Sequence, residues 1–171
     1  METLGKSFFE QDVDTVAKNL LGSCLNFYNY KAIICETESY DENDPASHSF
    51  GGKITKRNQA MFASAGSIYV YLIYGMYYCL NLVTGKEGEG AAVLIRAVFL
   101  PKDNLFINGP GKVCKFLNIT KEHNKLLVIN NPNISVTQNT NISKKYTFTA
   151  TTRIGITKGK DLLRRYLINN V

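Results

Sequence analysis

Two carboxylates and a tyrosine alternate in the segment Ala32-Ile-Ile-Cys-Glu-Thr-Glu-Ser-Tyr40. Successive side chains of a β-strand point to opposite faces, so Glu36, Glu38 and Tyr40 would share one face. One such carboxylate can deprotonate a water and stabilise positive charge on a sugar while a glycosidic bond breaks. The spacing does not choose between Glu36 and Glu38, and a solvated charge at a strand end is the ordinary alternative for each. We expect both to leave the core where the strand runs out towards a loop, with the functional carboxylate exposed.

Tyrosines are concentrated within one short stretch that contains Tyr69, Tyr71, Tyr74, Tyr77 and Tyr78. For Tyr69 and Tyr78 we expect packing in the core, because aromatic side chains favour strands. Tyr71 and the earlier Tyr40 come from different strands and can face one concavity. Two aromatic planes with a gap between them can stack on both faces of a planar base, which contributes about 1–3 kcal/mol per base.

Tyr74 lies between two strand-like runs, residues 68–74 and 77–83. The leading glycine suits a two-residue hairpin connection of type II′ at Gly75-Met76. A bulky aromatic side chain at a tight turn is poorly placed for burial, and it has the shape of a wedge that can enter between base pairs. An enzyme that acts on an extruded nucleotide needs a base sandwich, an acid and a wedge, because its target bond is unreachable in the stacked duplex.

Two further segments have polar chemistry. His48 is one of two histidines and lies in a polar loop, where it can bind a phosphate or a base edge, although a loop histidine is usually just solvated. Gly109-Pro-Gly-Lys112 precedes an apolar run and can form an anion-binding nest, with a plain turn as the alternative. It lacks the spacing of a Walker A motif, which argues against nucleotide hydrolysis.

The elements that must position these residues follow from periodicity and from turn residues. Apolar residues recur at helical spacing in residues 12–21, with Asp12 as the N-cap and Gly22 as the stop. Residues 24–28 and 32–40 read as a hairpin, and a second hairpin joins residues 68–74 to 77–83. Residues 91–98 form another strand, which ends near Arg96.

The remaining segments give weaker signals. Residues 43–49 are of types that favour turns and can start a short helix. Residues 56–63 predict a helix that ends at Gly66, and residues 113–117 predict an apolar helix. Residues 118–147 are rich in Asn and Lys and predict an irregular surface segment, and residues 152–156 a short strand. The pattern predicts an α+β fold in a single domain over residues 1–171, with a curved, largely antiparallel sheet flanked by helices and a protruding β-hairpin.

Composition restricts the class of protein. With 171 residues, 44% hydrophobic and 20% charged, the chain is long enough for a real core and is neither fibrous nor disordered throughout. A net charge of +6 favours polyanions such as nucleic acid. The four cysteines, Cys24, Cys35, Cys79 and Cys114, lack zinc spacing, so we expect buried thiols, no metal and no cofactor. We expect a cytoplasmic protein, since neither a signal peptide nor an apolar run of membrane-spanning length is recognisable.

Several motifs match one known family and occur in its order. The matching blocks are Glu36-Thr-Glu-Ser-Tyr40, Asp44-Pro-Ala-Ser-His-Ser49, Thr55-Lys-Arg-Asn58 with Met61-Phe62, Tyr69-Val-Tyr-Leu-Ile-Tyr-Gly-Met-Tyr-Tyr-Cys-Leu-Asn81, Ala92-Val-Leu-Ile-Arg-Ala97, Gly109-Pro-Gly-Lys-Val-Cys114 and Arg153-Ile-Gly-Ile156. Through them the chain resembles the alkyladenine-type 3-methyladenine DNA glycosylases. The tyrosine block is the most specific of the motifs.

The resemblance implies roles for two catalytic residues and for a base pocket. Glu38, rather than Glu36, falls on the family's general base, which activates water. Arg96 falls on the residue that helps hold the catalytic water and the flipped nucleotide. Asn81 corresponds to the residue that helps exclude normal guanine. The residues implied to hold the flipped base are Tyr40, His48, Tyr71 and Asn81.

The resemblance also implies which residues touch the duplex. Tyr74 falls on the family's intercalating tyrosine, which fills the space that the flipped nucleotide leaves in the duplex. Met76 and Tyr77 would contact the duplex beside this space. The segment near the DNA backbone would include Lys53, Thr55 and Arg57.

By this resemblance the chain would be a monofunctional DNA glycosylase of base excision repair, without a lysine Schiff base or a cofactor, that leaves an abasic site. Its partner would be double-stranded DNA with a damaged purine, bound by a monomer that needs no protein partner. A damaged purine is electron-poor at its glycosidic bond, so we expect a preference for 3-methyladenine and 7-methylguanine, with hypoxanthine and ethenoadenine as further substrates.

Two other functions compete with this one. A non-catalytic DNA-binding module would keep the wedge and the basic surface, but it would not need Glu38 together with Tyr40, Tyr71 and Arg96. A hydrolase of free purine nucleosides would leave the exposed Tyr74 and the positive charge without a purpose.

Overall fold

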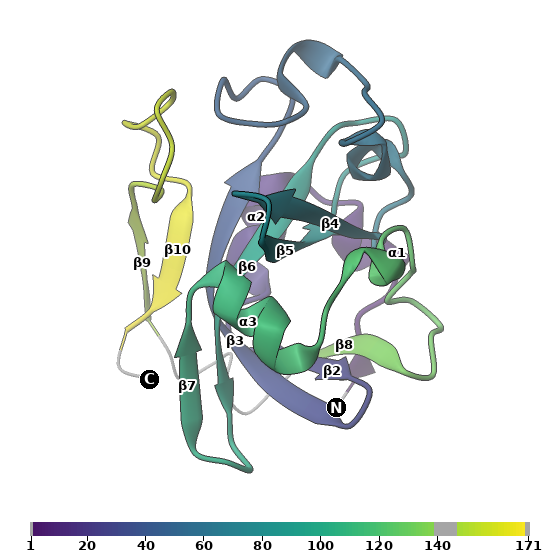
Figure 1. Ribbon diagram of the computed structural model, residues 1–171, viewed down its shortest axis with the longest axis vertical. Coiled ribbons are helices and arrows are strands. Elements are labelled where there is room, and N and C mark those ends of the chain that lie inside the picture. Colours follow the sequence, from purple (N-terminus) through teal and green to yellow (C-terminus); the bar gives the residue numbers. More distant parts are fainter. Residues whose placement is uncertain (1, 139–146, 170–171) are drawn as a thin grey trace.

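The computed structural model describes residues 2–138 and 147–169, and in this part of the chain every strand pair is antiparallel. One sheet has the order β1-β8-β2-β3-β6-β5-β4, with β10 beside β3, β9 beside β10 and β7 beside β6. The sheet curls strongly, so that β4 and β5 pass across the face of β6 and β3 (Figure 1). The strands are β1 (Glu2–Thr3), β2 (Cys24–Phe27), β3 (Tyr30–Tyr40), β4 (Ile68–Ile73), β5 (Tyr77–Val83), β6 (Ala92–Leu100), β7 (Leu105–Asn108), β8 (Ile134–Gln138), β9 (Phe148–Thr151) and β10 (Arg165–Ile168).

Short helices flank the sheet. Helix α2 packs against β3 and β6, and α3 packs against β5 and β6, with the main apolar core between these layers. The helices are α1 (Lys6–Phe9), α2 (Val13–Asn19) and α3 (Pro110–Leu117), and the 3-10 turns are η1 (Phe50–Gly52), η2 (Gln59–Phe62) and η3 (Lys121–His123). The predicted α+β class with a curved antiparallel sheet is confirmed. Among the described residues, no helix combines the length and the apolar character needed to cross a membrane.

Strand β3 is the central element of the sheet and has two different neighbours along one edge. Residues 30–33 pair with β2, whereas residues 36–38 pair with β10; the other edge pairs with β6. The hydroxyl of Thr37 donates to the carbonyl of Ala17 in α2 at 2.9 Å, and Ser39 donates to Asp14. Thr37 and Ser39 therefore face α2. Glu36, Glu38 and Tyr40 face the opposite side, as the alternation predicts.

The helix predicted for residues 12–21 is present as α2, shorter at its end. The Asp12 side chain accepts a hydrogen bond from the Thr15 N–H at 3.0 Å, which satisfies one of the free donors of the first turn. Gly22 follows with a positive φ of 79°, as expected of the residue that ends the helix. The four cysteines are buried free thiols, as predicted.

Two predicted helices are wrong. Residues 43–49 form consecutive turns, and the helix predicted for residues 56–63 is reduced to the 3-10 turn η2. Asn58 supplies the physical reason. Its side chain donates to the carbonyls of His48 at 2.7 Å and Lys53 at 2.9 Å and accepts from the Thr55 N–H at 2.7 Å. These bonds fix the backbone in turns, in competition with a helix.

Two predictions for the second half of the chain are also wrong. Residues 152–156 are not a strand, since β9 ends at Thr151 and the buried side chain of Arg153 fixes the following bends. Residues 118–147 are not irregular throughout, because they contain η3 and β8. Ile134 and Val136 alternate inward in β8, which fills the place between β1 and β2. Residues 139–146 of that prediction lie outside the described residues.

The tip of the β4–β5 hairpin differs from the predicted turn by one residue. Tyr74 and Gly75 both have positive φ, 53° and 67°, and the Met76 N–H donates to the Ile73 carbonyl at 3.2 Å. Positive φ at both central residues is the pattern of a type I′ turn rather than the type II′ turn predicted at Gly75-Met76. Tyr74 is itself a turn residue, and 80% of its surface is exposed.

Candidate active site

A cavity of about 690 Å³ opens beside the hairpin tip. Its walls come from β3, β4, β5 and β6, from the start of α3 and from the loops around residues 45–48 and 154–158. The predicted site residues in its lining are Glu38, Tyr40, His48, Arg57, Tyr71, Tyr74, Tyr77, Asn81 and Arg96. The structure therefore brings together both predicted catalytic residues and all four predicted base-pocket residues. Lys53, Thr55 and Met76 are exposed and do not line the cavity.

Glu38 lies at the cavity with no exposed side-chain surface, so the prediction of an exposed carboxylate at a strand end is wrong. The pairing of β3 with β10 and the loop after β9 cover this end of the strand. Oε2 accepts a hydrogen bond from the Tyr40 hydroxyl at 2.6 Å, and Oε1 accepts from the backbone N–H of Ile154 at 3.0 Å. Nε of Arg96 lies 3.6 Å from Oε1. Both oxygens are therefore oriented by fixed donors.

Glu36 has a different environment from Glu38. Its Oε1 accepts from Nε of Arg96 at 3.2 Å and from Nη1 of Arg165 at 2.8 Å. Glu36 is not part of the cavity lining. Two guanidinium groups neutralise it, and it in turn orients Arg96. Of the two carboxylates, only Glu38 borders the cavity.

Three rings line the cavity together with Glu38. The His48 ring meets the Tyr71 ring edge-on, with centroids 4.6 Å apart, and Tyr40 comes from the end of β3. Burial raises the pKa of the Tyr71 hydroxyl, and burial together with the charge of Glu38 raises that of Tyr40. Both phenols therefore stay neutral at pH 7. A planar base can enter between such walls, where stacking contributes about 1–3 kcal/mol.

His48 is tied to the buried Tyr69, whose hydroxyl lies 2.9 Å from Nδ1. Partial desolvation and then the positive charge of Arg57 lower the pKa of His48 to about 4, and burial raises the pKa of Tyr69 to about 12. The imidazole is therefore neutral at pH 7 and presents one hydrogen-bonding nitrogen to the cavity. The side chain of Asn81 is fixed similarly, since its Nδ2 donates to the Tyr69 carbonyl at 3.1 Å.

We expect an NMR titration of the His48 ring to give a midpoint of about 4. The unfolded chain would bind this proton nearer pH 6.5, so this residue makes stability fall as the pH falls from 6.5 to about 4. In Arg57→Met the midpoint should rise, because a neighbouring positive charge is removed. A wild-type midpoint at 6.5 or above would contradict the predicted desolvation.

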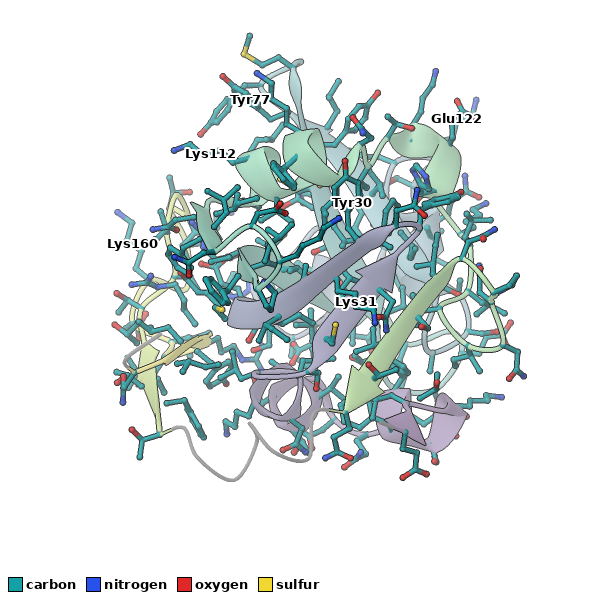
Figure 2. All side chains as sticks on the ribbon, turned by 90° about the horizontal axis from the view of Figure 1, so that it is seen from below. Tyr30, Lys31, Tyr77, Lys112, Glu122 and Lys160 are labelled. Carbon is teal, nitrogen blue, oxygen red and sulfur yellow. The ribbon has the colours of Figure 1, made fainter. Side chains whose placement is uncertain are left out.

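The predicted duplex-contacting residues form an exposed edge of the molecule. Tyr74, Met76 and Tyr77 are 80%, 65% and 47% exposed at the hairpin tip. Tyr77 packs beside the start of α3, where a Cβ added to Gly111 would lie 3.1 Å from that of Tyr77. Figure 2 shows Tyr77 and Lys112 on this same edge.

Arg57 joins the exposed edge to the loop before η2. Its Nη2 donates to the carbonyl of Leu72 at 3.2 Å, which ties residues 53–57 to strand β4. Its guanidinium also lies over the Tyr71 ring, 5.7 Å from the centroid. The segment with Lys53 and Thr55 is therefore held near the β4–β5 hairpin, although these two residues do not line the cavity.

Three residues that shape the site have no role predicted from the sequence. Asp44 and Arg153 form a buried ion pair whose side chains have no exposed surface, and Ile154 supplies the N–H that holds Glu38. Asp44 and Arg153 each lie within a motif that matched the family, and membership of a motif was the only available signal. Nothing in the spacing of residues this far apart predicts that they meet.

The chain is similar to several known proteins over almost its whole length. The family model described as methylpurine-DNA glycosylase (MPG) matches residues 7–171. A Rickettsia felis protein named "Putative 3-methyladenine DNA glycosylase" is 50% identical over 170 residues, which cover 98% of this chain and 94% of the relative. An Ehrlichia chaffeensis protein of the same name is 52% identical over 169 residues, covering 96% and 92%.

Proposed function

Since the chain belongs to the methylpurine-DNA glycosylase family, we propose that it hydrolyses the N-glycosidic bond of alkylated purines that have been flipped out of duplex DNA. The family makes it a DNA glycosylase of base excision repair. The substrates that we propose are 3-methyladenine and 7-methylguanine, with hypoxanthine and ethenoadenine as further ones. The product would be an abasic site, formed without a covalent enzyme intermediate.

In the proposed reaction, Glu38 accepts a proton from a water whose oxygen forms the new bond to C1′ of the sugar. The bond from C1′ to the purine nitrogen breaks, and its electron pair leaves with the base. A cationic methylpurine leaves as a neutral base and is therefore a better leaving group than a normal purine. This difference lets a pocket that accepts many purines still discriminate damaged bases from normal ones. The carboxylate also stabilises positive charge on the sugar, and Arg96 helps to hold the water and the nucleotide.

One observation carries this proposal. The carboxylate of Glu38, oriented by two donors, lies in a cavity walled by Tyr40, His48 and Tyr71 and bordered by the exposed Tyr74. A base must leave the stack to reach such a carboxylate, and a side chain at the entrance must fill the space that it leaves.

The test is to measure released base by chromatography and mass spectrometry. Matched duplexes would contain one 3-methyladenine, 7-methylguanine, hypoxanthine or ethenoadenine, with undamaged duplex and free nucleosides as controls. We expect release from damaged duplex alone, with no adduct trapped by borohydride. Equal release of base from free nucleosides would support a nucleoside hydrolase. Binding to damaged duplex without release of base would support the non-catalytic DNA-binding module. An adduct trapped by borohydride would exclude the monofunctional reaction.

The variant Tyr74→Ala should lower base release from duplex DNA by roughly 5- to 150-fold, which corresponds to the loss of about 1–3 kcal/mol of stacking. Release from the same lesion in single-stranded DNA should change much less, because no partner stack has to be opened. Tyr28→Ala is a matched control, since Tyr28 is also an exposed turn tyrosine with positive φ but does not line the cavity. Equal losses on both substrates would argue against a wedge.

We propose that the protein acts without a metal, because its cysteines and histidines lack the spacing of a metal site. We propose also that it acts as a monomer. Base release should therefore persist in excess EDTA, and light scattering should give a mass near 19 kDa. DNA binding should weaken as salt rises, because contacts with phosphates release counterions. Loss of activity in EDTA that added metal restores would contradict the metal-free reaction.

A further inference from the structure

The orientation of Glu38 depends on a segment without regular secondary structure. Its Oε1 accepts from the N–H of Ile154, in the bends that follow β9. A general base must be held close to its productive geometry, and small misplacements reduce rates strongly. A backbone donor in an irregular loop can provide that precision only if something holds the loop.

Arg153, the residue before Ile154, is the anchor of this loop. Its Nη1 donates to the carbonyl of Ser39 at 3.0 Å, and its Nη2 donates to the carbonyl of Gly159 at 3.3 Å. Ser39 lies between Glu38 and Tyr40 in β3, and Gly159 follows the cavity-lining residues 154–158 within the loop between β9 and β10. One guanidinium therefore joins both sides of the segment 154–158 to the strand that carries the proposed base.

The same guanidinium contacts the second group that orients Glu38. It lies 4.6 Å from the centroid of the Tyr40 ring, whose hydroxyl donates to Oε2. A cation over an aromatic face is attracted by the ring, and more strongly when both are desolvated. Arg153 is thus adjacent to both donors that bind the carboxylate, although it does not itself bind Glu38.

Asp44 connects this arrangement to a second loop that lines the cavity. Both of its oxygens accept hydrogen bonds from Arg153, and Oδ1 also accepts from the N–H of Ala46 at 3.0 Å. Ala46 and Pro45 line the cavity, as do residues 154–158. The ion pair therefore joins two loops that both line the cavity.

We propose that Arg153 is a positioning residue for base excision, which fixes Glu38 through the Ile154 N–H and the Tyr40 ring, with Asp44 as its counter-charge. This inference rests on the proposed role of Glu38 as the base. Arg153 acts through other residues and does not touch the substrate.

The test compares single-turnover excision by Arg153→Met, Arg153→Lys and Ile134→Ala on duplex with one ethenoadenine. Ile134 is buried in β8 and does not line the cavity, so its alanine variant is a destabilised control without a positioning defect. All rates are measured well below each melting temperature. Binding to duplex with a tetrahydrofuran abasic analogue is measured in parallel.

We expect Arg153→Met to lose about 10- to 100-fold in single-turnover rate with nearly unchanged affinity for the analogue. Arg153→Lys should recover part of the rate, because it keeps a cation but cannot donate to Asp44, Ser39 and Gly159 together. Ile134→Ala should keep the wild-type rate while it is folded. If Arg153→Met does not fold, Arg153→Lys tests the same prediction. A rate equal to that of the Ile134→Ala control would overturn the proposal.

An amide NMR measurement separates this inference from the proposed function. The Ile154 resonance should shift in Arg153→Lys and in Glu38→Gln, but not in Ile134→Ala, whether or not Glu38 is the base. An unmoved Ile154 resonance in Arg153→Lys would overturn the positioning role. If instead Glu38→Gln keeps full base release while the resonance shifts, the proposed function fails and the structural link stands.

Discussion

Replacement of Glu38 by glutamine is expected to reduce base release from alkylated duplex DNA by about 10²- to 10⁴-fold, the usual range for loss of a general base. Glutamine has the same shape and can still accept from the Ile154 N–H, but it cannot take a proton from water. The fold and the binding of an abasic-analogue duplex should therefore be retained. Single-turnover release, circular dichroism and DNA titration measure these three properties.

Glu36→Gln is the matched control, because it makes the same change two residues away on the same face of β3. Glu36 lies outside the cavity lining and contacts Arg96 and Arg165. We expect a much smaller loss, which arises from altered orientation of Arg96. If Glu36→Gln lost as much activity as Glu38→Gln, or if Glu38→Gln remained active, the assignment of the base would be wrong.

The second large effect concerns stability. Asp44→Ala should lower the free energy of unfolding by about 3–5 kcal/mol, because removal of one partner leaves the other charge buried and uncompensated. The Arg153 side chain has no exposed surface, and its Nε has no hydrogen-bond partner among residues 2–138 and 147–169. Loss of Asp44 would leave the Arg153 guanidinium with backbone carbonyls as its hydrogen-bond acceptors. Urea denaturation followed by circular dichroism measures the change.

Asp41→Ala provides the comparison within the same loop. Asp41 is partly exposed and pairs with Arg164, which also contacts Asp14. We expect a change of about 1 kcal/mol or less, as for most partly solvated ion pairs. The double variant Asp44→Ala/Arg153→Met should recover part of the lost stability, since no charge is then stranded. An Asp44→Ala variant as stable as Asp41→Ala would show that water or other groups compensate the guanidinium.

Features determined by local sequence could be predicted well. The two-residue alternation placed Glu36, Glu38 and Tyr40 on one face of β3, and the structure confirms it. The exposed position of Tyr74 follows from its place between two strands. The turn was misplaced by one residue because a glycine with positive φ fits the second central position of a type I′ turn as well as the first of a type II′ turn.

Features that depend on distant residues could not be predicted. Arg153 and Asp44 are 109 residues apart, and Arg96 meets Glu36 across 60 residues. The burial of Glu38 was missed because its cover comes from β10 and from the loop after β9, and no local pattern shows where a later strand will pair. Strand β8 was missed because its two buried positions stand in an Asn-rich segment.

The change of neighbour along one edge of β3 has a consequence for biosynthesis. A ribosome delivers residues 30–40 and their β2 and β6 partners well before β10 and residues 153–159, which shield Glu38. A partly made chain can therefore pair much of its sheet while the Glu38 side chain is still exposed to solvent. The last part of the chain to be made therefore completes both the wall of the cavity and the cover of Glu38.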